Sequence, residues 1–326
     1  MKKIISFLFA AIFLGILILS CHKEDVKPNT IFKNGLSIRY FEDLQELQYE
    51  LDNIANMDFD ELVEYESNLN FNSYGKTAYL LVEELTGDTT ILSEEMLAQI
   101  EQYYPQYFII TTECDENADI IVDIRYDNTP FTFIMNEDRM FQVGDSVYKV
   151  FDDCLVITDI ANIEDLSSLD EDGLPEIEGN EDYLVLYYQE EEAKTNHGRY
   201  LYEEGVNGKE KVKSWLVLTQ LERHSVNGCV IASYSLDLKI KGFRKFCGIF
   251  WPVKRTLSDN IYCGISINNV TYYNSDQGSS SGYVRNVPIM WGLNMEAPLY
   301  YQPQYYITYA VGYARTPAAI AVYNYQ

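Results

Sequence analysis

The chain has 326 residues, and 47% of them are hydrophobic, which is enough to build a packed core and excludes a disordered protein. Its formal net charge is −26 at pH 7, so we exclude nucleic acids and other polyanions as partners of the acidic part. That charge is uneven, because residues 1–199 contain 42 acidic residues against 12 Lys and Arg, whereas residues 200–326 contain 8 against 12. The asymmetry predicts two regions with different surfaces, and the acid excess is typical of a solubilising surface rather than of cation binding.

Residues 1–20 have the layout of an export signal peptide. Two lysines precede an apolar run from Ile4 to Leu19, and this run is shorter than the roughly 20 residues that a membrane-spanning helix needs. The segment Ile18–Cys21 resembles a lipobox, in which a small residue precedes a cysteine that becomes lipidated. We therefore expect lipidation of Cys21 and attachment to a membrane through that lipid. An uncleaved N-terminal anchor helix is the alternative.

Residues 21–35 are expected to form a tether between the lipid and the folded body. The stretch His22-Lys23-Glu24-Asp25 resembles the export tag of Bacteroidetes surface lipoproteins, in which a basic or polar residue precedes paired acids. This resemblance implies a protein that is anchored in the outer membrane and faces the cell exterior.

Residues 36–160 predict an α+β region that begins with helices. Asp58 followed by Glu61 has the arrangement of a capping box at the start of a second helix. Further helices are predicted at Thr77–Leu85 and at Glu94–Tyr104. The first helix is predicted from apolar residues that recur at spacings of three and four and so share one face: Phe41, Leu44, Leu47, Leu51 and Ile54.

From residue 107 the pattern changes to short β-strands separated by turn residues, which favours an antiparallel meander. The acidic and turn-rich residues 161–182 are either a linker between two domains or a long surface loop within one domain. The strands of the meander are expected in the segments YFIITT, ADIIVDIR, FTFIMN, RMFQVGDSVYKVF and CLVITDI.

Residues 183–326 predict a β-rich domain with hairpins at Asn227-Gly228 and at Asn268-Asn269. The final AIAVYNY segment is expected to close a sheet. The fold class predicted for the chain is α+β, with a helical N-terminal segment, an antiparallel β meander and a mostly antiparallel, β-sandwich-like C-terminal region. In the alternating segment SLDLKIK, two sets of side chains are expected to face opposite ways: Leu236, Leu238 and Ile240, and Asp237, Lys239 and Lys241.

The residues that commonly carry chemistry are sparse. The chain has three histidines, and Cys229 lies near His224, but no orienting third group for a thiol nucleophile is recognisable. The acids between Asp170 and Glu178 fail the spacing of an EF-hand calcium loop. We therefore expect no catalytic residues, no cofactor and no metal site.

Five cysteines remain besides Cys21, so at least one thiol is unpaired in a monomer. The compartment permits disulfides, and Cys247 with Cys263 is the pair to test first, because the two could lie on neighbouring strands.

Tyrosine is unusually abundant, with 28 residues, eight of them between positions 300 and 325. An aromatic ring with a hydroxyl group suits the binding of glycans or proteins. The alternative is that these aromatic residues are ordinary formers of half-buried strands. The candidate ligand-binding residues are Tyr300, Tyr301, Tyr305, Tyr306 and Trp251.

Two short segments, Asp88-Thr89-Thr90 and Asp145-Ser146-Val147, resemble the O-glycosylation site of exported Bacteroidetes proteins. Thr89 and Ser146 are therefore candidate modification sites.

The lipobox, the acidic tag and the order of helices before strands resemble uncharacterised surface lipoprotein families of gut Bacteroidetes, which are domains of unknown function. The Gly-Asp pair that precedes Tyr-Lys in RMFQVGDSVYKV is similar to a strand motif of such proteins. The resemblance implies a location and supplies no catalytic residues.

The leading hypothesis is a non-enzymatic binding or adhesion module for glycan or protein at the cell surface. One alternative is a hydrolase of extracellular polymers with an unrecognised carboxylate pair. Another is a structural subunit of a surface assembly, which would offer an unpaired edge strand to a partner.

Overall fold

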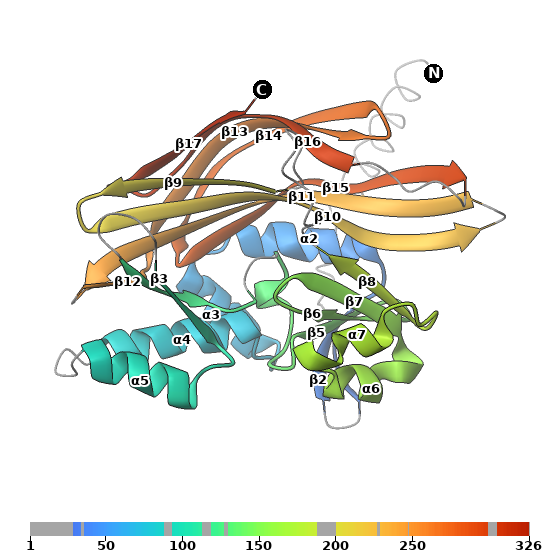
Figure 1. Ribbon diagram of the computed structural model, residues 1–326, viewed down its shortest axis with the longest axis horizontal. Helices are drawn as coiled ribbons and strands as arrows, with labels where there is room; N and C mark the ends of the chain where they lie inside the picture. Colours follow the sequence, from blue (N-terminus) through green and yellow to red (C-terminus); the bar gives the residue numbers. More distant parts are fainter. Residues whose placement is uncertain are drawn as a thin grey trace, which may run out of the picture.

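Three β-sheets and six α-helices make up the part of the chain that the structure describes, which has a mixed α+β fold (Figure 1). The computed structural model describes residues 29–33, 36–87, 93–112, 119–126, 130–187, 200–226, 229–246, 248–298 and 305–325. Within these ranges, no helix is both long enough and apolar enough to cross a membrane.

Two strands and four helices come first along the described chain. The Asp43 side chain caps the first helix by accepting hydrogen bonds from two backbone N–H groups of the first turn. The capping box of Asp58 and Glu61 is confirmed at the start of the next helix. Phe41, which we expected on the first helix, instead ends a strand, because the Asp43 cap starts the helix after it. The elements are β1 (Asn29–Lys33), β2 (Leu36–Phe41), α2 (Leu44–Ala55), α3 (Phe59–Asn68), α4 (Tyr74–Gly87) and α5 (Ser93–Tyr103).

Sheet A has six strands in the order β1-β2-β5-β6-β7-β8. β2 and β5 are parallel, and the other neighbours are antiparallel. The strand prediction for FTFIMN was wrong, because Pro130–Phe133 forms a 3-10 helix. Its side chains are all buried rather than alternately buried, and a short apolar run without alternation does not distinguish a strand from a helical turn. The new strands are β5 (Met140–Val143), β6 (Ser146–Val150), β7 (Cys154–Asp159) and β8 (Tyr183–Tyr187).

The acidic residues 161–182 fold against sheet A. They contain two short helices, α6 (Ile163–Ser168) and α7 (Leu174–Ile177). Their apolar residues are buried in one cluster with side chains of β5 and β6, while most of the acids of the segment stay exposed. The segment therefore covers one face of the sheet and is neither an extended linker nor an unstructured loop.

Sheet B joins strands from both halves of the sequence in the order β3-β4-β12-β11-β10-β9, and a further strand, β15, pairs with β11. The link between the halves is the parallel pairing of β4 with β12. β10 and β11 pair antiparallel with Val226 opposite Cys229, as the predicted hairpin requires, while the turn residues Asn227 and Gly228 lie outside the described residues. The strands are β3 (Phe108–Thr112), β4 (Ile120–Ile124), β9 (Tyr200–Asn207), β10 (Glu210–Val226), β11 (Cys229–Phe246), β12 (Ile249–Pro252) and β15 (Val284–Pro298).

Both faces of β11 are buried, which the alternating SLDLKIK segment did not indicate. Leu236, Leu238 and Ile240 share one face, as expected. The opposite face carries Asp237, Lys239 and Lys241, which are only 0–4% exposed. The second face is covered by elements from the first half of the chain: Lys241, for example, forms an ion pair with Asp123 of β4, and α2 packs against the neighbouring strand β15 (Figure 1).

Sheet C has four strands in the order β14-β13-β16-β17, and all its neighbours are antiparallel. The predicted hairpin at Asn268-Asn269 is confirmed, since both residues have a positive φ, 49° and 66°, as the favoured two-residue hairpin turn requires. Sheets B and C share one apolar core, to which β10, β11, β13, β15, β16 and β17 contribute. The strands are β13 (Arg255–Ile267), β14 (Val270–Gly282), β16 (Tyr305–Arg315) and β17 (Ile320–Tyr325).

Candidate functional site

The outer face of sheet C presents tyrosine rings to solvent. Along β13, Ile261, Cys263 and Ile265 point inward and are at most 1% exposed. Tyr262 lies between them on the opposite face and is 47% exposed. Tyr273, on the neighbouring β14, is 59% exposed. Because side chains alternate along a strand, the inner residues hold the sheet to its core and leave the outer ones free for contact with other molecules.

The pairing register brings three of these rings together. Gly264 of β13 lies directly opposite Tyr273 on one side and Tyr309 on the other. The rings of Tyr262 and Tyr273 are nearly parallel, with an interplanar angle of 7° and centroids 6.0 Å apart. The ring of Tyr309 meets Tyr262 edge-on, with centroids 5.7 Å apart. These contacts fix the rings relative to one another, which lowers the entropy that a ligand must remove on binding.

Gly264 makes room for this arrangement. A β-carbon at this position would lie 2.7 Å from the Tyr273 ring and 3.1 Å from Oγ1 of Thr308. Both distances are shorter than ordinary van der Waals contact, so a larger residue would displace the Tyr273 ring. The glycine therefore lets Tyr273 lie close against the sheet.

The rest of the outer face carries no acidic residue and a single charge. The register assigns fifteen outward positions to four rows across the sheet, and none of the fifteen is Asp or Glu. At the frequency of acids in residues 200–326, 8 in 127, about one would be expected. Arg315 is the one charged residue among them. The fifteen positions are Ser258, Ser279, Arg315 and Ile320; Asn260, Gln277, Tyr313 and Val322; Tyr262, Ser275, Val311 and Asn324; and Gly264, Tyr273 and Tyr309.

The binding residues predicted from sequence are placed differently. Tyr305 is 9% exposed and packs against Tyr234 in the core between sheets B and C. Tyr306 is half-buried. Trp251 is 1% exposed, so it packs in the core and offers no ring to a ligand, contrary to our expectation. Tyr300 and Tyr301 lie outside the described residues.

The sequence analysis missed Tyr262 and Tyr273. They lie in the segment YCGISINNVTYY, whose alternation and turn residues were used only to predict a hairpin. The sequence does contain a signal that could have identified them: a turn at Asn268-Asn269 places Tyr262, Gly264 and Tyr273 on one face of the hairpin.

The predicted modification sites remain predictions. Cys21 and Thr89 lie outside the described residues. Ser146 begins β6 and is half-buried.

The two described cysteines whose thiols can be assessed, Cys154 and Cys263, are free and buried. Cys263 therefore forms no disulfide here, and its expected partner Cys247 lies outside the described residues. Burial raises the pKa of the Cys263 thiol to about 12 and also raises that of Cys154. Neither thiol is a nucleophile at neutral pH, because the thiolate is the reactive form.

Two carboxyl groups, the buried one of Asp259 and the half-buried one of Asp276, lie behind the tyrosine face. Nε of Arg285 donates to Oδ1 of Asp259 at 2.7 Å, and Nη2 donates to Oδ2 of Asp276 at 3.2 Å. Nη1 donates to the backbone oxygen of Ala55 at 2.8 Å, which ties the end of α2 to β15. Burial raises the pKa of Asp259, although the charge of Arg285 opposes the rise.

These carboxyl groups do not form a site for polymer hydrolysis. Asp259 is only 2% exposed. A cavity lined by Ala55 and Arg285 has a volume of about 20 Å³, which is room for roughly one water molecule. A substrate chain could not enter it, so we assign the cluster a structural role.

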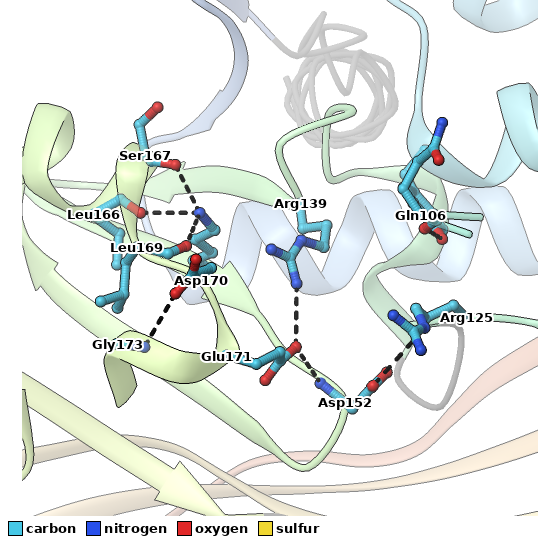
Figure 2. A network of polar contacts seen from close by, with 12 residues as sticks. Gln106, Arg125, Arg139, Asp152, Leu166, Ser167, Leu169, Asp170, Glu171 and Gly173 are labelled. Carbon is cyan, nitrogen blue, oxygen red and sulfur yellow. Dashed lines mark hydrogen bonds and ion pairs between the residues drawn. The ribbon is translucent and has the colours of Figure 1, made fainter. Parts of the chain in front are cut away.

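A second polar network lies beside sheet A (Figure 2). The ammonium group of Lys149, which is 2% exposed, donates to the backbone oxygens of Leu166, Ser167 and Leu169 at 3.0, 2.8 and 2.7 Å. These oxygens end α6, where a positive charge is favourable. Burial lowers the pKa of Lys149 to about 8. The lysine of the GDSVYK segment thus fastens the acidic segment to β6.

The remaining charges of that network are paired with one another. Nη1 of Arg139 lies 3.4 Å from Oε1 of Glu171, and Nε of Arg125 lies 3.9 Å from Oδ2 of Asp152 (Figure 2). The Arg139 guanidinium also lies 4.1 Å from the centroid of the Tyr126 ring. Because each cation is occupied by protein groups, the network is better explained by packing than by ligand binding. Within the described ranges, no cluster of three or more His, Cys, Asp and Glu side chains could hold a metal ion.

Comparison with known proteins gives one match. No protein-family model matches the chain, and no curated protein matches it. Among solved structures, the chain is similar to a DUF4848 family protein from Bacteroides thetaiotaomicron, with 12% sequence identity and a TM-score of 0.30, over 89% of this chain and 95% of that one. A likeness this distant supports no functional argument, so the proposal below rests on the geometry of the outer face.

Proposed function

We propose that this protein is a lipid-anchored binding protein that recognises a glycan through the outer face of sheet C. The observation that carries the proposal is a group of three tyrosines on a face without acidic residues: Tyr262 and Tyr273, which are exposed, and Tyr309, which is half-buried. The surface of a soluble protein is roughly 25–35% charged, so fifteen outward positions would ordinarily include four or five charges. One charge and four tyrosines are instead typical of a contact surface.

The chemistry of the face favours a glycan over a protein partner. Sugar rings offer C–H faces that pack on aromatic rings, and their hydroxyl groups both donate and accept hydrogen bonds. The outer face pairs tyrosine rings with neutral hydroxyl and amide groups that can do the same. These groups belong to Ser258, Asn260, Ser275, Gln277 and Asn324.

The location of the protein belongs to the same proposal. Asn29–Lys33, which we expected in the tether, form strand β1 of sheet A, so the proposed tether shortens to residues 21–28. Signal-peptide cleavage before Cys21 and lipidation of its thiol would anchor this tether in the outer membrane, with the body facing the exterior. Sheets B and C would then act as a β-sandwich-like platform that holds the tyrosine face toward the ligand. A Cys21→Ala variant should lose lipid labelling and leave the membrane fraction. Normal membrane partition of that variant would refute the anchor.

Glycan-array binding by the purified protein tests the function. The double variant Tyr262→Ala and Tyr273→Ala should lower the affinity for any bound glycan by at least about tenfold, since central aromatic residues dominate binding energy. Tyr103→Ala is the matched control, because Tyr103 is 60% exposed on α5, outside sheet C, and it should bind normally. Binding to proteins alone, or glycan binding that survives the double variant, would refute the proposal.

A further inference from the structure

Arg315 differs from the other described arginines whose side chains can be assessed. Each of the others has a carboxylate oxygen within 4.0 Å, as shown by the ion pairs of Arg39, Arg125, Arg139, Arg244, Arg255 and Arg285. Arg315 has no such ion pair with any described residue. Acids are few in this part of the chain, since residues 200–326 contain 8 acidic residues against 12 Lys and Arg.

Neutral contacts hold the Arg315 side chain on the outer face. Its Nε donates to Oγ of Ser258 on β13 at 3.1 Å. Its Cζ lies 5.3 Å from the centroid of the Tyr313 ring on the same strand. These two contacts orient the guanidinium group. A guanidinium fork of this kind matches a carboxylate, which can accept two parallel hydrogen bonds.

The position of Arg315 places this cation at one end of the tyrosine face. Ser258, its partner across the strands, lies four residues before Tyr262 on β13. At about 3.3 Å per residue along a strand, the cation and the Tyr262 ring are separated by roughly 13 Å. One ligand of a few sugar units could therefore contact both.

We propose that the glycan recognised by this face is acidic, and that Arg315 binds a carboxylate of a uronic-acid unit while Tyr262 and Tyr273 pack against neighbouring sugar rings. This inference rests on the proposed glycan-binding function and adds the chemical class of the ligand. Charge complementarity supports it, because the fifteen outward positions include this cation and no acid that would repel or compete with the ligand. The acids that the same strands do carry, Asp259 and Asp276, are turned inward and bound to Arg285.

Binding of matched oligosaccharides by the purified protein tests the inference. The probes are tetramers of galacturonate, glucuronate and mannuronate, each compared with its carboxyl-reduced neutral counterpart by titration calorimetry. We expect at least one acidic tetramer to bind five- to tenfold more tightly than its counterpart. That preference should weaken as the ionic strength rises, because an exposed ion pair is screened by salt.

Variants assign the preference to a residue. Arg315→Gln should bind the acidic and neutral tetramers equally, and Arg315→Lys should recover only part of the preference because it lacks the planar fork. Arg244→Gln is the control, since the Arg244 side chain is 58% exposed on β11, outside sheet C, and it should retain the preference.

The results of these experiments distinguish failure of the acidic-ligand inference from failure of the proposed glycan-binding function. If neutral and acidic tetramers bind equally well, or if Arg315→Gln keeps the preference, the acidic-ligand inference is wrong. The glycan-binding function would still stand in that case, provided that the Tyr262→Ala and Tyr273→Ala variant loses binding. If no oligosaccharide binds the unaltered protein, both proposals fail.

Discussion

The stability of the α3 region should depend on pH through Glu66. This residue is 0% exposed, and its carboxylate accepts hydrogen bonds from the backbone N–H of Ser73 at 2.9 Å and from the Ser73 hydroxyl at 2.7 Å. Burial raises the pKa of Glu66 from 4.5 to about 7, although the hydrogen bonds from Ser73 and the nearby charges of Lys76 and Arg39 oppose the rise. The folded protein therefore holds a proton that the unfolded chain releases at lower pH.

The sign and size of the effect follow from that difference. A carboxyl group with a raised folded-state pKa contributes stability that is fully present below pH 4.5 and is lost as the pH rises through 7. At roughly 1.4 kcal/mol per pH unit, the total is about 3 kcal/mol. About 2.5 kcal/mol of this falls between pH 5 and pH 8.5. Glu66→Gln keeps the shape and the contact with Ser73 but cannot ionise.

The measurement is urea unfolding of both proteins across that pH range. The free energy of unfolding of Glu66→Gln, minus that of the unaltered protein, should increase by about 2.5 kcal/mol from pH 5 to pH 8.5. Glu64→Gln, an exposed position on the same helix, is the control and should show no such trend. A Glu66→Gln difference that stays constant over the range would refute the reasoning, because it would mean that Glu66 ionises equally in both states.

Three further predictions concern local structure. Lys149→Met should destabilise the protein by about 3 kcal/mol in urea unfolding, because three buried carbonyl oxygens lose their donor; a change below about 1 kcal/mol would contradict this. Asn269→Val should cost about 1–2 kcal/mol in thermal unfolding, because a β-branched residue is strained at a φ of 66°, whereas Asn269→Gly should be nearly neutral; equal effects would show that the turn can relax. Gly264→Ala should weaken glycan binding about fivefold by displacing the Tyr273 ring while the protein stays folded by circular dichroism; unchanged binding would show that the ring position does not matter.

Local signals in the sequence predicted the hairpins. Each was predicted from a dipeptide, Asn227-Gly228 or Asn268-Asn269, so no distant partner was needed to recognise it. The helix that begins at Asp58 was predicted for the same reason, because its cap lies within four residues. The start of the first helix was misplaced because Phe41 fits the helical spacing as well as it fits a strand that pairs with β5.

Contacts between distant segments explain what the sequence could not show. Phe243, Phe250 and Trp251 lie in a segment of the sequence that is rich in lysines and arginines. They are at most 1% exposed, and the neighbouring Lys241 and Lys245 form ion pairs with Asp123 and Asp119, more than 100 positions earlier in the chain. The parallel pairing of β4 with β12 brings these residues together. Neither the composition nor the periodicity of the sequence indicates that β4 pairs with β12.

The polarity of sheet C supports a binding role independently of the ligand's identity. If the outer face of sheet C contacted only water, we would expect charged residues on that face and tyrosines on the inner face. In β13 the order is reversed, because Asp259 is buried with Arg285 while Asn260 and Tyr262 face solvent. Burying an ion pair carries a desolvation cost that its attraction does not always offset. The outer face, with its single charge, has the opposite consequence. A ligand that covers it displaces water from rings, hydroxyls and amides. The ligand also removes the hydration of one cation, and the ligand's own carboxylate can replace that hydration.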